Sequence, residues 1–155
     1  MAELGPFMRL AEEFDSVLLR SYWRWAVPDS HVPLLITIFG DWVFGAEDGS
    51  HWVLSILDGN YFQVAESAVE FNCKKRSFDW LCENFIAGWQ EIADRAGIVP
   101  EKDQCIGWVI PPVIGGEFSV QNMRIYPMPV WQLIMGQMLR QLSVASNAQG
   151  EGSES

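Results

Sequence analysis

The spacing of apolar residues predicts a helix near the start of the chain. From Phe7 to Trp25 the large apolar side chains recur at helical intervals, which places them on one face. Pro6 suits the first turn of such a helix, and Pro28 prevents its continuation. The sequence therefore predicts one amphipathic N-terminal helix.

The period then changes to that of β-strands. Extended segments are predicted over 34–39, 41–44, 51–57 and 60–65. Residues 47–50 are typical of a turn. Asp58-Gly59 indicates a two-residue hairpin, because both central positions of that turn need positive φ. The pattern predicts an antiparallel meander.

Helical spacing returns after the meander. A short helix is predicted over 68–75, and the apolar stripe from Phe78 to Ala93 predicts a long one. Ser77 is suited to cap its start and Gly97 its end. Cys82 falls on the apolar stripe, so we expect it in the core.

The last third predicts strands over 104–110, 117–120 and 123–126, then a helix from Pro129. From residue 144 the chain is small and polar, which is typical of disorder. The expected fold is α+β: an antiparallel sheet meander packed by an N-terminal and a C-terminal helix. It forms a single domain over 1–143, followed by a disordered tail over 144–155.

Composition narrows the possible partners. The chain has 155 residues, of which 49% are hydrophobic, so it can bury a core. Ten Lys and Arg against 20 Asp and Glu give a net charge of −10. We therefore expect no direct binding to nucleic acid or to anionic membranes, and a basic protein such as a nuclease is the natural complement. Solubility alone also explains an acidic composition.

The cysteines indicate a reducing compartment. Cys73, Cys82 and Cys105 are an odd set without a close pair, which argues against a disulfide framework. The N-terminus lacks the basic start and apolar segment of a signal peptide, and no stretch of about 18 apolar residues occurs. The expectation is a cytoplasmic protein that is monomeric or dimeric.

The chain shows no pattern of catalytic chemistry. His31 and His51 lack metal-ligand spacing, and Gly115-Gly116 lacks the Lys of a phosphate loop. No catalytic residue, metal or cofactor is expected, so the protein is predicted not to be an enzyme. Turns favour acidic residues in any protein, but an acidic rim round the meander could also bind a basic cleft. The predicted partner contacts are Asp41, Glu47, Asp48, Asp58 and Glu66.

The segment from Gln104 to Leu142 carries a resemblance. Gln104-Cys105 opens a strand, Pro111-Pro112-Val113-Ile114-Gly115-Gly116-Glu117-Phe118 follows, and a helix containing Gly136 to Gln141 closes it. With the upstream segments Phe39 to Phe44 and Asp48 to Gly59, this pattern resembles a bacterial family of immunity proteins for type VI secretion DNase effectors. Leu139 stands where a His is frequent in that family.

The resemblance implies an antitoxin that binds and neutralises a cognate toxin, a basic nuclease, through its acidic surface. The prolines and glycines of the motif are interpreted as structural, so partner contacts are expected elsewhere. An alternative remains open: a small-ligand-binding domain or thiol-dependent enzyme with a Trp-lined pocket. This alternative depends on the 8 Trp residues and on Cys105 as a nucleophile.

Overall fold

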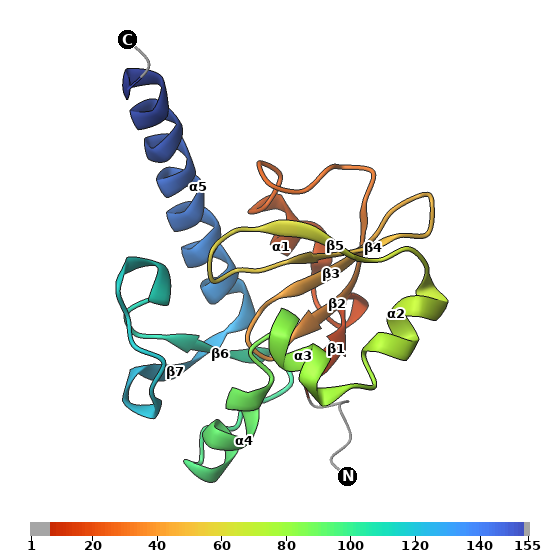
Figure 1. Ribbon diagram of the computed structural model, residues 1–155. Coiled ribbons are helices and arrows are strands. Elements are labelled where there is room, and N and C mark those ends of the chain that lie inside the picture. The colour runs from red at the N-terminus through yellow and green to blue at the C-terminus, as the bar shows by residue number, and fades with distance from the viewer. Residues whose placement is uncertain (1–6, 154–155) are drawn as a thin grey trace.

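A computed structural model describes the backbone of residues 7–153 and the side chains of residues 7–146. The chain forms a five-stranded sheet in the order β1-β2-β3-β4-β5, and a separate pair, β6 and β7 (Figure 1). The strands are β1 (Met8–Leu10), β2 (Val32–Thr37), β3 (Trp42–Gly45), β4 (His51–Leu54), β5 (Tyr61–Ala65), β6 (Gln104–Trp108) and β7 (Met123–Pro127). The helices are α1 (Ser16–Ser21), α2 (Ala68–Lys74), α3 (Phe78–Asn84), α4 (Gly88–Arg95) and α5 (Met128–Ser153), with short 3₁₀ turns η1 (Ala11–Glu13), η2 (Pro112–Ile114) and η3 (Val120–Asn122). The α+β class with an antiparallel meander is confirmed.

The meander is antiparallel throughout, and helices pack against both of its faces. Trp42 lies opposite Leu54 on β4, so the two side chains share one face. α1 and α5 cover that face, whereas α2 and α3 cover the other, where Phe71 stacks on His51 at 4.9 Å (Figure 1). The β4–β5 connection is wider than the predicted two-residue turn: it spans 55–60, and only Gly59 within it has positive φ.

The predicted N-terminal helix over 7–25 is wrong. Residues 8–10 form the edge strand β1, with Met8 opposite Thr37, and the helical structure in this range is limited to η1 and to the short α1, which Asp15 caps. Phe7 is fully buried against Phe39 and Phe85. Strand pairing and this burial override the local helical spacing, because tertiary packing outweighs propensity.

The long helix predicted from Phe78 to Ala93 is divided into α3 and α4. Phe85 breaks it with extended backbone angles, φ −137° and ψ 160°, and its ring enters the core beside Phe7 and Trp80. Within α3 the buried side chain is Leu81, whereas Cys82 is exposed and not in the core as expected. The short helix α2 and the Ser77 cap, which accepts from the Trp80 amide, are confirmed.

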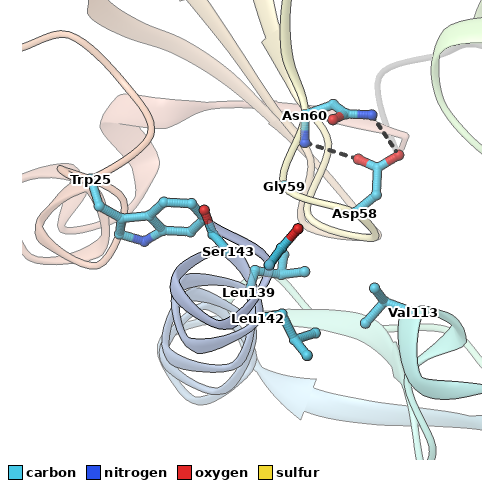
Figure 2. Close-up of a pocket in the computed structure, with 9 residues that line it drawn as sticks. Trp25, Asp58, Gly59, Asn60, Val113, Leu139, Leu142 and Ser143 are labelled. Atoms are coloured by element: carbon cyan, nitrogen blue, oxygen red, sulfur yellow. Dashed lines mark hydrogen bonds between the residues drawn. The ribbon is translucent and has the colours of Figure 1, made fainter. Parts of the chain in front are cut away.

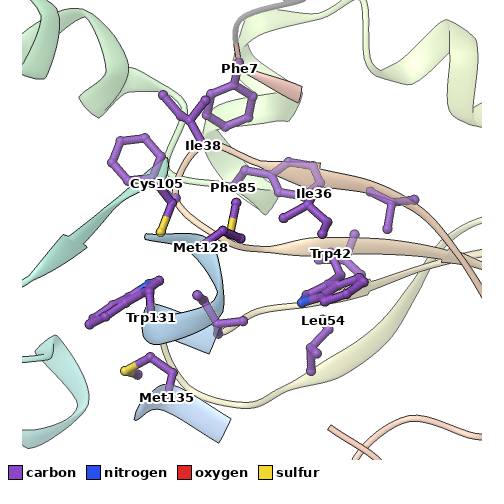
Figure 3. Packing of buried hydrophobic residues seen from close by; sticks show 14 of the residues in the cluster. Phe7, Ile36, Ile38, Trp42, Leu54, Phe85, Cys105, Met128, Trp131 and Met135 are labelled. Carbon is purple, nitrogen blue, oxygen red and sulfur yellow. The ribbon is translucent and has the colours of Figure 1, made fainter. Parts of the chain in front are cut away.

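The C-terminal part joins the main sheet through the core. The Ile106 amide donates to the Ile38 carbonyl at 2.7 Å, and Cys105, Trp131 and Met135 enter the same apolar cluster as Trp42 (Figure 3). β6, β7 and the helix from residue 129 onward are confirmed. The predicted strand over 117–120 is not formed, and η3 begins at its last residue, Val120.

α5 runs through the segment in which the sequence indicates disorder. The helix continues to Ser153, and residues 141–146 are exposed along the part that projects from the body (Figure 1). Its first half packs through Trp131, Met135 and Leu139. Once that packed half is formed, each further residue adds one backbone hydrogen bond without a new nucleation cost. The structure therefore differs from the expected disorder over 144–153.

Candidate functional site

The predicted acidic contacts do not form one continuous rim. Glu47 and Asp48 lie in the β3–β4 turn, and Glu66 follows β5 at the same end of the sheet; all three are exposed. Asp58 is also exposed but lies in the β4–β5 loop at the opposite end. The length of the sheet therefore separates the exposed acids into two groups.

Asp41 is not available to a partner, which corrects its prediction as a contact. Its side chain is only 3% exposed, and its Oδ1 accepts a hydrogen bond from the Ile56 amide at 2.9 Å. Burial raises the pKa of Asp41 to about 7; the Ile56 bond opposes this shift and the charge of Asp58 adds to it. Asp41 therefore connects the start of β3 to the chain after β4.

Asp48 adjoins an aromatic cluster that the sequence did not predict. Its Oδ1 accepts from the Ser50 hydroxyl at 2.6 Å and from the Ser50 amide, and these bonds lower the pKa of Asp48. Trp52 donates to the same hydroxyl at 2.9 Å and stacks on Tyr61. His31 lies against both rings, with its Nδ1 2.6 Å from the Tyr61 hydroxyl. Asp48 is thus a fixed carboxylate connected through Ser50 to a cluster of partly exposed aromatic rings.

The alternation of β4 and β5 could have placed Trp52 and Tyr61 on one face. His31 could not have been assigned to them, because it lies in the loop before β2 and reaches them only in the folded chain. The cluster is therefore a long-range feature.

The surface charge is hardly compensated within the molecule. In the described chain two ion pairs occur, Glu70–Lys74 at 2.9 Å and Glu91–Arg95 at 2.6 Å, each within one helix. The other described acids, except buried Asp41, are exposed and form no ion pair. The negative charge thus faces solvent.

A groove lies at the Asp58 end of the sheet. It has a volume of about 310 Å³ and lies between the β4–β5 loop, η2 and α5 (Figure 2). The Asp58 carboxylate accepts from the Asn60 amide at 2.9 Å and from the Asn60 side chain at 3.0 Å, which fixes the loop above the groove. The lining residues are Trp25, Asp58, Gly59, Asn60, Val113, Leu139, Leu142, Ser143 and Ser146. With a single Trp, this groove is not the Trp-lined pocket of the alternative hypothesis.

Cys105 does not have the surroundings of an activated thiol. It is fully buried, and burial raises the pKa of its thiol, which keeps it protonated at neutral pH. Within residues 7–153 no group of three or more His, Cys, Asp or Glu side chains could hold a metal ion. None of the described helices has the length and apolar character to cross a membrane.

Comparison with known proteins shows a similar fold. No protein-family model and no curated protein sequence matches the chain. The chain is similar to the crystal structure of Atu4351 from Agrobacterium tumefaciens, with a TM-score of 0.58 and 14% sequence identity. The similarity covers 85% of this chain and 67% of that one. At this identity the similarity supports the fold alone.

Proposed function

We propose that the protein is an immunity protein that binds and neutralises a basic toxin, a nuclease of the type VI secretion class. The observation that carries the proposal is the surface charge: nearly every described acid is exposed and has no ion pair within the chain. A basic cleft that holds phosphates is the electrostatic complement of such a surface. The resemblance of the segment from Gln104 to Leu142 points the same way.

Inhibition by such a protein needs binding and no chemistry. Carboxylates that enter a nuclease cleft occupy the place of substrate phosphates, and long-range attraction speeds the encounter. The three cysteines are free, which agrees with action in a reducing cytoplasm.

The exposed acids at the two ends of the sheet are the contacts to test. Asp48 is linked through the Ser50 hydroxyl to Trp52, which stacks on Tyr61, and Trp and Tyr are enriched in interface hot spots. Glu47 and Glu66 are exposed at the same end of the sheet as Asp48. Asp58 lies beside the groove.

The test is co-expression of the tagged protein with the product of the adjacent upstream gene. The proposal expects an equimolar complex, association that slows with added salt, and loss of the plasmid cleavage that the upstream product causes alone. Failure to form any complex would overturn the proposal.

Charge reversals then locate the contact. E47K/D48K/E66K and D58K each invert one end of the sheet, and E83K on α3 is the matched control, because Glu83 is an exposed acid outside both groups. We expect one of the two end variants to weaken the complex at least about tenfold, and E83K to leave it unchanged. Unchanged binding by both end variants would contradict an acidic contact at the predicted residues.

A further inference from the structure

The loop between β6 and β7 is braced by the side chain of Asn122 together with backbone hydrogen bonds, among them that of the Gly116 amide to the Pro111 carbonyl. Asn122 accepts from the Ile110 amide at 2.9 Å and donates to the Ile110 and Glu117 carbonyls at 2.8 and 2.9 Å. Gly116 lies so close to Ile110 that an added Cβ would stand 1.6 Å from the Ile110 carbonyl oxygen. The backbone of the loop is therefore fixed before any partner arrives.

The fixed loop presents apolar side chains to solvent. Ile110, Val113 and Ile114 are 52%, 39% and 51% exposed. Single exposed apolar residues are common, but several on one rigid loop form a patch of the kind that marks an interaction site. Gly115, with a φ of +100°, and Gly116, next to the Ile110 carbonyl, thus have the structural role expected of them, and the side chains exposed on the same loop are apolar.

Val113 connects this patch to the groove over α5. Val113 and Leu142 face each other across the groove, and Trp25 lies at its other end (Figure 2). Gly59 closes the middle, where an added Cβ would lie 3.5 Å from Trp25 and 3.6 Å from Leu139. Asp58 is the one charged side chain among the lining residues. The groove thus places the apolar side chains of Val113 and Leu142 beside a carboxylate, and Asn60, Ser143 and Ser146 add polar groups to its lining.

We propose that this groove is the docking site for an apolar side chain flanked by Lys or Arg on the basic partner. The inference rests on the proposed function and assigns the contact to the Asp58 end of the sheet. A volume of about 310 Å³ is at the lower end of the range for ligand pockets, which suits one or two side chains. The flanking cation follows from Asp58 and from the uncompensated negative surface around it.

The test uses matched pairs of variants against the purified product of the adjacent upstream gene. V113S and L142S remove apolar area from opposite walls, and V17S is the control, because Val17 on α1 is 77% exposed and outside the groove. D58N removes the rim charge, and E83Q is its control. All five substituted side chains are exposed, so folding is expected to persist and is checked by circular dichroism.

We expect V113S and L142S to weaken the complex about tenfold each, mainly through faster dissociation, since one buried apolar side chain supplies that much. D58N is expected to slow association at low salt and to match the wild type at high salt. V17S and E83Q are expected to bind as the wild type does.

Two results would contradict the proposed docking site, and they differ in what they imply for the immunity function. If all three groove variants bind like the wild type while E47K/D48K/E66K loses binding, the docking site is wrong and the immunity function stands. If the wild type binds no upstream product, the immunity function fails and the docking site fails with it.

Discussion

At the residue scale, one buried amide joins segments that are far apart in sequence. Gln132 on α5 is fully buried, and its Oε1 accepts from Trp23 at 2.7 Å and from Trp42 at 2.9 Å. Its Nε2 donates to the Gly40 carbonyl at 2.8 Å. The amide thereby uses both acceptor lone pairs and one donor. It connects α5 to three other places: the segment that follows α1, strand β3 and the β2–β3 turn.

Replacing Gln132 with Leu is expected to lower the free energy of unfolding by about 3 kcal/mol. The apolar side chain leaves the Trp23 and Trp42 N–H groups and the Gly40 carbonyl without these partners, at about 1–3 kcal/mol for each buried group. Urea unfolding monitored by fluorescence measures the loss. Q137L is the control, because Gln137 is exposed on the same helix. Equal stability of the two variants would show that the amide network contributes little.

The raised pKa of Asp41 predicts a pH dependence of stability. The folded carboxyl, with a pKa of about 7 against an ordinary value of 3.8, binds more protons than the unfolded one between these values. Stability from this group is therefore highest at low pH and falls as pH rises, by up to about 1.4 kcal/mol per unit, until it levels off above 7.

The check is urea unfolding of the wild type and D41N from pH 4.5 to 8. The Asn side chain keeps an oxygen that can accept from the Ile56 amide, but it does not ionise in this pH range. The wild type is expected to lose stability relative to D41N as pH increases. Parallel curves across this range would mean that Asp41 ionises normally.

At the element scale, two adjacent glycines in the β6–β7 loop are expected to differ in the cost of adding a Cβ. An added Cβ at Gly115 meets no atom within 4 Å, although its φ of +100° strains any other residue, whereas at Gly116 it meets the Ile110 carbonyl. We expect G115A to cost about 1–2 kcal/mol and G116A about 3 kcal/mol. Urea midpoints and amide exchange at Ile110 measure the effects. A G115A loss equal to that of G116A would contradict the steric argument.

The sequence predicted correctly those elements whose buried side chains recur with the period of a strand or helix, or whose ends carry their own capping residue. β3 and β4 alternate or are buried throughout, and α2 and the start of α3 carry their own Ser caps. The two wrong helix predictions have one cause. Phe7 and Phe85 each have helical spacing to their neighbours, yet both rings pack together in the core and pull their segments into extended backbone. The local sequence pattern cannot predict a contact between residues so far apart in the chain.

In the candidate site too, features that depend on local sequence were predicted, and features that depend on long-range contacts were not. Glu47, Asp48, Asp58 and Glu66 were placed correctly at exposed turns and strand ends, because turn chemistry is local. Asp41 could not be distinguished from them, since its burial and its hydrogen bond from the Ile56 amide arise only when the segment after β4 packs beside the start of β3. The groove was likewise beyond sequence reasoning, because the segment after α1 that carries Trp25, the β4–β5 loop, η2 and α5 meet there only after folding.

At the scale of the whole molecule, the charge that would attract a partner also opposes folding. Exposed carboxylates without ion pairs repel one another, and a net charge of −10 on 155 residues makes the repulsion general. The free energy of unfolding is therefore expected to rise between about 0.01 and 0.3 M NaCl, as the Debye length falls from about 30 Å to below 8 Å. Urea unfolding at constant pH measures this increase, with potassium chloride as a check against ion-specific effects.

The salt dependence of association distinguishes a charge retained for a partner from one that only maintains solubility. If the acids steer a basic toxin, the association rate is expected to fall at least about tenfold over the same salt range in which the fold gains stability. A protein that is acidic for solubility alone gives the gain in stability without the fall in rate. Stopped-flow association with the upstream product and urea unfolding, measured in the same buffers, test the two together. A rate independent of salt would remove the electrostatic basis of the immunity proposal, because the uncompensated surface would then have no part in the encounter.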